Sequence, residues 1–553
     1  MNSSTLFRVL AFLVVAACVA ACPKRPEDPP KPKTAAVGAS LQTVVAQTSA
    51  IDPHDDAIPW RRGDVDAAFA EARAADKPVF LYWGATWCPP CNQVKATLFN
   101  RREFIERTQF FVPVYVDGDT PAAQRLGTRF SVSGYPTMVL FKPDGTEITR
   151  LPGEADAERY MQVLALGMSA TRPVRETLKA AMADGKSLTV DDWRMLAWYS
   201  WDTDDQQLVP TAQVASTLKT LAAHCPADYG DVHARLALKA AAADGSGVGA
   251  AKPKSKPVLA EVESVLASPK TARENFDLLT NALPEIVRAT TAPASPERMR
   301  LVGDADRVLA QLAADATLSN TDRLGATIAR VQLATLDAKP ADAEGKAAAV
   351  VINDRLRDQA RAEAARADRE SADPYERQTV INAVAYLLPS AGLIDESDRL
   401  LTAELSRSHS PYYFMLDLAS NANKRGDKAG AIAWYQKAYD AAKGPATRLQ
   451  WGAGYIGTLV DLAPDDAARI EDVASRVIRE LEPAPDTFYD RNRRALERMG
   501  SKLVTWNKDK KHNDSLQRIR AQMTGVCAKL PRADPARATC DGVLRRPVKS
   551  IDS

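Results

Sequence analysis

Residues 55–170 switch repeatedly between two hydrophobic periodicities. Short runs rich in Val, Phe, Tyr and Trp are typical of buried strands, and between them apolar residues recur about every three to four positions, as in helices. Elements that alternate in this way predict an α/β layer fold. The expected elements are helices over 64–75 and 89–100 and strands over 79–83, 110–116, 138–141 and 147–151, the last two forming a hairpin around Pro143-Asp144-Gly145.

From residue 171 to 545 the pattern is almost wholly helical. The composition is rich in Ala, Leu, Arg and Asp, apolar residues keep helical spacing, and strand signals are few. Residues 243–256 combine Gly, Pro and Lys, which predicts a linker or long loop. We therefore expect an α/β domain followed by a large all-α region, with a short tail over 546–553.

One internal repeat is visible in the helical region, between Gly392 and Gly426, which lie 34 residues apart. Each precedes a helix with residues at matching offsets, and the pattern resembles a tetratricopeptide repeat. The second unit matches well, whereas the first departs because Glu404 stands where Ala is usual. At least three units are needed to bury a continuous core, and 448–462 with 465–481 can supply a third helix pair. The alternative is an irregular helical domain with one fortuitous repeat.

The first 21 residues have the pattern of an export signal. Arg8 supplies positive charge, and the apolar run that follows is too short to span a bilayer. Two Val-Ala-Ala-Cys tetrads end at Cys18 and Cys22, and they resemble the lipobox of bacterial lipoproteins, whose cysteine is lipidated. We select Cys22, because cleavage there leaves an apolar core of about ten residues, within the range of export signals. The alternative is a plain secretory signal with incidental cysteines.

Export implies a periplasmic protein that is lipid-anchored to a membrane. Pro23, rather than Asp, follows Cys22, which by resemblance slightly favours the outer membrane. Residues 22–54 are rich in proline and charge, so they predict an extended tether. The length of 553 residues requires two or more domains, and the net charge of +2 gives no indication of a nucleic-acid partner.

Outside the cytosol, disulfides persist, so the remaining cysteines are interpreted in that light. Cys527 and Cys540 lie close together near the C-terminus, and a structural disulfide between them would add about 3 kcal/mol. The alternative is two unpaired thiols. Cys225 has no obvious partner, which favours a buried thiol over a reactive one.

The candidate chemistry lies in Trp87-Cys88-Pro89-Pro90-Cys91, which follows a buried-strand pattern and opens a helix. At a helix N-terminus the dipole stabilises a thiolate, so Cys88 is the expected nucleophile. Cys91, one turn later, can resolve the mixed disulfide. The alternatives are an inert disulfide or half of a zinc site. No second Cys-x-x-Cys exists and His54 is the only nearby histidine, so we expect neither a metal nor a cofactor.

These residues resemble the thioredoxin family over 55–170. Besides Trp-Cys-x-x-Cys, the chain has Gly134-Tyr135-Pro136-Thr137 just before a strand. The resemblance implies that Pro136 is cis, that Tyr135 contacts an extended substrate, and that Trp87 lines the substrate surface. The alternatives are that Trp87 only packs the loop and that the Tyr135 ring only fills space.

The chain departs from cytosolic thioredoxin at two positions. Tyr82 stands where a buried acid helps to deprotonate the second cysteine, and Pro113 falls near the place of an accompanying lysine. The Pro89-Pro90 dipeptide is seen in membrane-tethered thioredoxin-like reductases. No histidine lies between the cysteines, so the resemblance favours a reductant or exchange partner over an oxidant.

The main hypothesis is an exported, lipid-anchored thiol–disulfide oxidoreductase that acts on protein disulfides or thiols. It requires an upstream dithiol protein as electron donor, and it requires Cys88 to be ionised and accessible. The alternative is that the helical region is an assembly scaffold and the thioredoxin-like domain a redox-silent docking module.

Overall fold

The computed structural model describes residues 57–153, 155–204, 206–245, 256–338, 352–481 and 484–545. The expected export signal, the tether with Cys22, and the tail over 546–553 lie outside these residues. So does most of the expected linker, although its first three residues, 243–245, end a helix.

The α/β domain is built on one mixed sheet of five strands, ordered β1-β3-β2-β4-β5. β2 pairs in parallel with β3, β1 adds to the outer side of β3, and β4 and β5 continue the sheet antiparallel on the other side of β2. The strands are β1 Arg61–Arg62, β2 Val79–Gly84, β3 Val112–Asp117, β4 Thr137–Phe141 and β5 Glu147–Leu151. The predicted strands and hairpin are confirmed.

Helices cover both faces of the sheet, and β2 is therefore buried along its whole length. Val79, Leu81 and Trp83 point to the side of α1, whereas Phe80 and Tyr82 point to the side of α2 and α5. The helical segments of this domain are α1 Val65–Ala75, α2 Pro89–Val94, η2 Lys95–Phe99, α3 Arg102–Arg107, η3 Thr108–Phe110, α4 Pro121–Arg129 and α5 Ala157–Ser169. The helix expected over 89–100 is present, but its second half is the π-helical segment η2.

After α5 the described residues form only helices and connecting turns, apart from one isolated β-bridge between Val132 and Asp204. Their first half contains α6 Val174–Ala183, α7 Val190–Trp198, η4 Thr211–Gln213, α8 Val214–His224, η5 Ala227–Tyr229, α9 Gly230–Gly245, α10 Lys256–Ala267, α11 Pro269–Glu274, α12 Phe276–Asn281, α13 Leu283–Thr290, α14 Pro296–Ala314 and α15 Asn320–Ala334. Their second half contains α16 Asp354–Glu370, α17 Pro374–Ser390, α18 Ile394–Glu404, α19 Pro411–Lys424, α20 Lys428–Ala441, α21 Pro445–Leu462, α22 Ala467–Glu480, η6 Pro485–Phe488, α23 Asp490–Trp506, α24 Asn513–Cys527 and α25 Pro535–Gly542.

The repeat positions form consecutive helix pairs. Gly392 and Gly426 both have a positive φ, near 80°, at the turns before α18 and α20, a conformation that suits glycine. Glu404 is buried where the repeat pattern has Ala, and it accepts two hydrogen bonds of 2.7 Å from the Arg377 guanidinium. The departure from the pattern is thus a buried ion pair rather than a packing defect. The third pair, α21 with α22, is also present.

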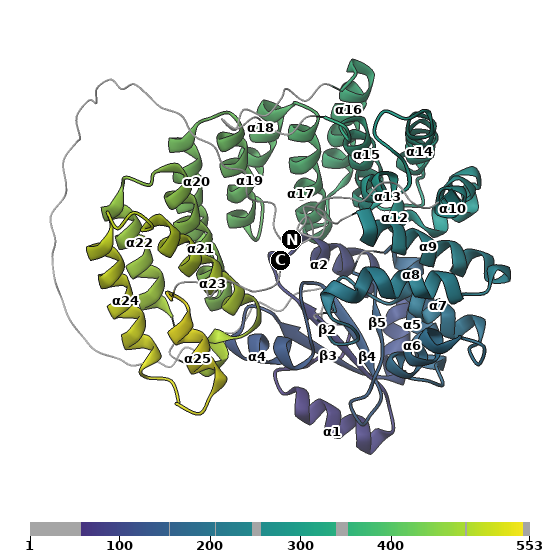
Figure 1. Ribbon diagram of the computed structural model, residues 1–553, viewed down its shortest axis with the longest axis horizontal. Helices are drawn as coiled ribbons and strands as arrows, with labels where there is room; N and C mark the ends of the chain where they lie inside the picture. Colours follow the sequence, from purple (N-terminus) through teal and green to yellow (C-terminus); the bar gives the residue numbers. More distant parts are fainter. Residues whose placement is uncertain are drawn as a thin grey trace.

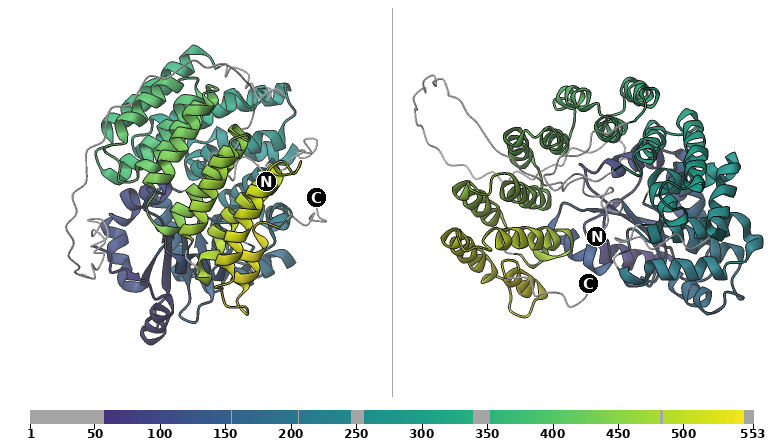
Figure 2. Two further views of the ribbon diagram at one scale, coloured as in Figure 1. Left: turned by 90° about the vertical axis from the view of Figure 1, so that its left-hand side faces the viewer. Right: turned by 45° about the horizontal axis from the view of Figure 1, so that its top comes forward.

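The helical region forms an arc around the sheet domain (Figure 1). It begins beside β5 and α5. Its helix α17 packs against α2, and its segments η6 and α23 pack against α4 (Figure 2). Within the described part of the chain, no helix combines the length and the apolar character needed to cross a bilayer.

Candidate functional site

The Cys-x-x-Cys pair lies where β2 passes into α2. Cys88 is the N-cap of α2, Pro89 occupies the first turn, and the Cys91 N–H donates to the Cys88 Sγ at 3.2 Å. The two sulfurs are joined in a disulfide with an S–S distance of 2.09 Å. The Asn92 amide donates to the carbonyls of Thr86 and Cys88, both at 3.0 Å, and so fixes the loop. Cys88 therefore sits at the positive end of a helix, where a thiolate is favoured.

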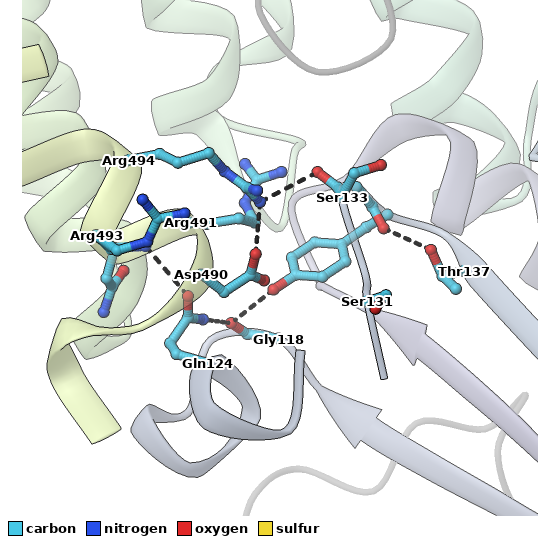
Figure 3. Close-up of polar contacts among 12 residues, drawn as sticks. Gly118, Gln124, Ser131, Ser133, Thr137, Asp490, Arg491, Arg493 and Arg494 are labelled. Atoms are coloured by element: carbon cyan, nitrogen blue, oxygen red, sulfur yellow. Dashed lines mark hydrogen bonds and ion pairs between the residues drawn. The ribbon is translucent and has the colours of Figure 1, made fainter. Parts of the chain in front are cut away.

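The Tyr135-Pro136 peptide bond is cis and lies beside this loop, because β4 pairs with β2 from Thr137 opposite Trp83. The Tyr135 hydroxyl donates to the Gly118 carbonyl at 3.2 Å, and the Thr137 hydroxyl donates to the Gly134 carbonyl at 2.8 Å (Figure 3). Burial raises the pKa of Tyr135, so the phenol stays neutral. The rings of Trp87 and Tyr135 lie 6.4 Å apart.

Tyr82, which stands where cytosolic thioredoxin has a buried acid, packs among other aromatic rings. The Tyr82 ring lies 4.8 Å from Phe99 and 5.4 Å from Tyr115, on the face of the sheet opposite the Trp83 side. Tyr82 and Pro113 are thus part of the packing against α2 and α5, in place of the acid and lysine of cytosolic thioredoxin.

The dithiol site is covered by the helical region, contrary to the expectation that Cys88 is accessible. Cys88 is 2% exposed and Cys91 is not exposed. Tyr413 of α19 stacks on Trp87 with centroids 5.8 Å apart, and Trp451 of α21 meets the same ring edge-on at 5.1 Å. The cavity left beside Cys88 measures about 10 Å³, no more than the space for one water molecule.

Polar contacts between the two regions surround this cover. Asp119, after β3, accepts a 2.6 Å hydrogen bond from the Thr447 N–H in the first turn of α21. His409 lies 3.1 Å from the Thr86 carbonyl through its Nε2 atom. Arg494 of α23 donates to Asp490 at 2.5 Å and to the Ser133 carbonyl at 3.4 Å, and Figure 3 shows it reaching from its helix toward that loop.

Burial raises the pKa of Asp119 to about 6, although the hydrogen bonds from Thr447 favour its charged form. Farther along the same rim, Arg125 of α4 is ion-paired with Asp486 and Asp534, the second at 2.8 Å. The rim of the cover therefore consists of a few separate polar contacts.

The structure brings five of the predicted site residues together: Trp87, Cys88, Cys91, Tyr135 and Pro136. Cys527 and Cys540 lie elsewhere, between α24 and α25, where an S–S bond of 1.95 Å joins them. Cys225 is a free, buried cysteine, and burial raises the pKa of its thiol to about 12.

Sequence reasoning missed the residues that the helical region adds to the site, namely Tyr413, Trp451 and Arg491. Each lies on a helix at spacing that equally suits an ordinary helical core. No motif links any of them to residues more than 300 positions earlier in the chain.

Comparison with known proteins agrees with the fold and the dithiol. A family model described as a thioredoxin-like domain matches residues 65–167. A thioredoxin-like protein of Synechocystis is 35% identical over 99 residues, which are 18% of this chain and 90% of that protein. A thioredoxin of Mycobacterium tuberculosis is 37% identical over 90 residues, 16% of this chain and 72% of that protein.

The thiol:disulfide interchange protein DsbD 1 of Pseudomonas aeruginosa is 36% identical over 102 residues, 17% of this chain. The match spans only 16% of the length of that relative. Through its sheet domain the chain belongs to the thioredoxin-like family. With a Cys88–Cys91 pair at the start of α2, this domain is a thiol–disulfide oxidoreductase.

Proposed function

We propose that the protein is an exported, lipid-anchored oxidoreductase that exchanges disulfides with protein substrates and acts more as a reductant than as an oxidant. One observation carries the proposal: Cys88 caps α2 and accepts the Cys91 N–H beside the cis-Pro136 edge. A thiolate in that position is stabilised by the helix and is the attacking species in disulfide exchange.

The reaction transfers two electrons. The Cys88 thiolate attacks one sulfur of a substrate disulfide, and the other substrate sulfur leaves as a thiolate. Cys91, after losing its proton, attacks the Cys88 sulfur, which releases the second substrate thiol and forms the Cys88–Cys91 disulfide. An upstream dithiol protein then reduces that disulfide and is itself oxidised.

Substrate binding requires the helical cover to move. In the thioredoxin-like site the substrate backbone lies beside Tyr135 and Pro136, and Trp87 lines the same surface. Tyr413 and Trp451 occupy that surface in the closed arrangement. We infer that α19 to α25 swing away from the dithiol when a substrate binds.

The proposed location is the periplasmic side of a membrane, with a lipid on Cys22 and the tether over 22–54 carrying the folded regions. Support comes from the tandem lipobox-like tetrads and from the likeness to a protein named thiol:disulfide interchange protein. Labelling with a radioactive fatty acid in the native host tests this part. The label should be lost in Cys22→Ser and retained in Cys18→Ser.

A trapping experiment tests the proposed chemistry. The variant Cys91→Ser should accumulate a mixed disulfide with substrate proteins through Cys88, because the resolving thiol is absent. The matched control Cys88→Ser/Cys91→Ser should give none. An absence of adducts in Cys91→Ser, together with insulin reduction that is unchanged in Cys88→Ser, would contradict the assignment.

A second candidate function has one observation in its favour, which is the burial of Cys88 beneath the helical region. In it the cover is permanent, the helical region is a scaffold, and the sheet domain only docks. Full function in the native host after replacement of both Cys88 and Cys91 would favour this candidate.

A further inference from the structure

Arg491 is a buried cation that the helical region places at the dithiol. It lies at the start of α23, and the residue is 8% exposed. Its guanidinium carbon is 4.8 Å from the centre of the Tyr135 ring and 5.5 Å from that of Trp87. Together with Cys88, Pro89 and Pro90, Arg491 lines the small cavity beneath the cover.

Unlike its neighbours on α23, Arg491 forms no ion pair within the described part of the chain. Arg493 is paired with Glu497 at 2.9 Å, and Arg494 with Asp490 at 2.5 Å. The guanidinium of Arg491 donates only to a neutral acceptor, the Gln450 Oε1, at 3.2 and 3.4 Å. Burial lowers its pKa. A buried cation without an anion is costly, so a negative charge formed in this cavity would be strongly stabilised.

Cys88 is the group in the cavity that can supply that charge. The ionisable residues lining the cavity are Cys88, Tyr135, Tyr413 and Arg491. Burial raises the pKa of both tyrosines, so they stay neutral. The thiol of Cys88, once its disulfide is reduced, is then the group that ionises most readily beside the guanidinium.

We propose that Arg491 stabilises the thiolate that Cys88 forms after reduction of the disulfide, and so completes the dithiol site from the helical region. This proposal rests on the proposed function. Arg491 is a positioning residue, because it acts only through the charge of the Cys88 thiolate.

The step balances with a dithiol as the reductant. Reduction brings two electrons and two protons to the Cys88–Cys91 disulfide, and the reductant becomes a disulfide. Cys88 then releases its proton to solvent while the cover is open, and its negative charge faces Arg491 once the cover closes. Cys91 retains its proton until the resolving step.

Other charged groups face the site from each element packed on it. Asp490 is already paired with Arg494, and Asp119 accepts from Thr447, so neither neutralises Arg491 within hydrogen-bond distance. The groups are Lys95 on η2, Asp117 at the end of β3, Asp119 after β3, His409 before α19, Asp417 on α19, and Asp490, Arg494 and Arg498 on α23. All remain in place in the variants that follow.

The pH profile of alkylation tests the proposal in the full chain. In the background Cys91→Ser/Cys225→Ala, the rate of Cys88 alkylation by iodoacetamide is followed from pH 4 to pH 10. Adding Arg491→Gln should move the midpoint of the profile to higher pH by about one unit, a tenfold change in the ionisation equilibrium. Arg491→Lys should shift it by much less, because it keeps the charge. Arg493→Gln, an exposed change on the same helix, should leave it in place.

The plateau rate at high pH reports access, so an opened cover changes the plateau, while a lost charge changes the midpoint. If Arg491→Gln does not fold, as judged by circular dichroism, Arg491→Met gives the same comparison. An unchanged midpoint without the charge, or an equal shift in Arg491→Lys, overturns the proposal. Because trapping by Cys91→Ser with Arg491 intact is scored separately, failure of this proposal is distinguishable from failure of the proposed function.

Discussion

Two of the seams at which the helical region meets the sheet domain are built in different ways. The first, the β5 seam, is centred on Arg150, which is fully buried and donates to the carbonyls of Phe130, Ser131 and Thr203 at 2.6–2.8 Å. It also pairs with Glu147 at 3.2 Å. Burial alone would lower the pKa of Arg150, but the attraction of Glu147 and neighbouring acidic groups raises it.

Tyr199, Asp204 and Gln207 extend this network from the helical region. Tyr199 donates to Glu147 at 3.1 Å, and Gln207 donates to the same carboxylate at 2.7 Å. The second, the dithiol seam, is formed by Trp87, Tyr135, Tyr413, Trp451 and Arg491. Ring contacts dominate it, and Arg491 at its centre forms no ion pair among the described residues.

The contrast between the two seams indicates which part of the arc is able to move. A satisfied buried network loses several partners together when it opens, whereas each aromatic contact contributes about 1 kcal/mol beyond its buried area. We therefore expect α6 to α9 to stay fixed on the sheet while α19 to α25 separate from the dithiol. Three sets of substitutions test this contrast between the seams.

The largest expected effect is at the centre of the β5 seam. Arg150→Met leaves Glu147 buried without its cation, and the free energy of unfolding should fall by about 3–5 kcal/mol. Urea unfolding measures the change. The matched control is Arg125→Met at the rim of the dithiol seam, where the arginine is 43% exposed and the loss should stay below about 1 kcal/mol. Equal losses in the two variants would remove the distinction between the seams.

The next effect concerns the disulfide between α24 and α25. Replacing Cys527 and Cys540 by Ser releases a short loop, which should destabilise this end of the arc by about 3 kcal/mol. Hydrogen exchange should quicken in α24 and α25 and leave α6 to α9 unchanged. Cys225→Ala is the control. Faster exchange across the whole arc would show that its two ends are not independent.

The smallest effect is a pH dependence at Asp119. Its pKa is raised to about 6 in the folded chain from 3.8, so the folded state binds the proton more tightly. Stability from this group is present below about pH 4 and is lost as the pH rises through about 6, by roughly 2 kcal/mol.

Asp119→Asn keeps the acceptor for Thr447 without the charge. The stability difference between the variant and the wild type should therefore grow in favour of the variant from pH 4 to pH 7. Thermal unfolding across that range measures it. Asp144→Asn is the control, because hydrogen bonds from Thr146 lower the pKa of this exposed group. A difference that does not vary with pH would contradict the role assigned to Asp119.

The local parts of the site could be predicted from the sequence because each has a local physical cause. The strand before Cys88, the helix that Pro89 opens, and the motif around Pro136 depend on residues close in the chain. The cover could not be predicted. Tyr413 and Trp451 are aromatic residues on helices, and nothing in such a pattern shows whether they pack on a neighbouring helix or on another domain. The ion pair of Glu404 was missed for a related reason, since its partner Arg377 lies on a different helix.

The occupant of the dithiol face is part of the same polypeptide, so it is always present at a high effective concentration. A client gains access only in the open fraction of molecules, and its apparent dissociation constant rises in inverse proportion to that fraction. Thiols and disulfides that bind weakly therefore do not compete with the closed arrangement, and they do not reach the dithiol. If the proposed function holds, the contacts of Trp87 with Tyr413 and Trp451 set an affinity threshold for the proteins that exchange electrons with this one.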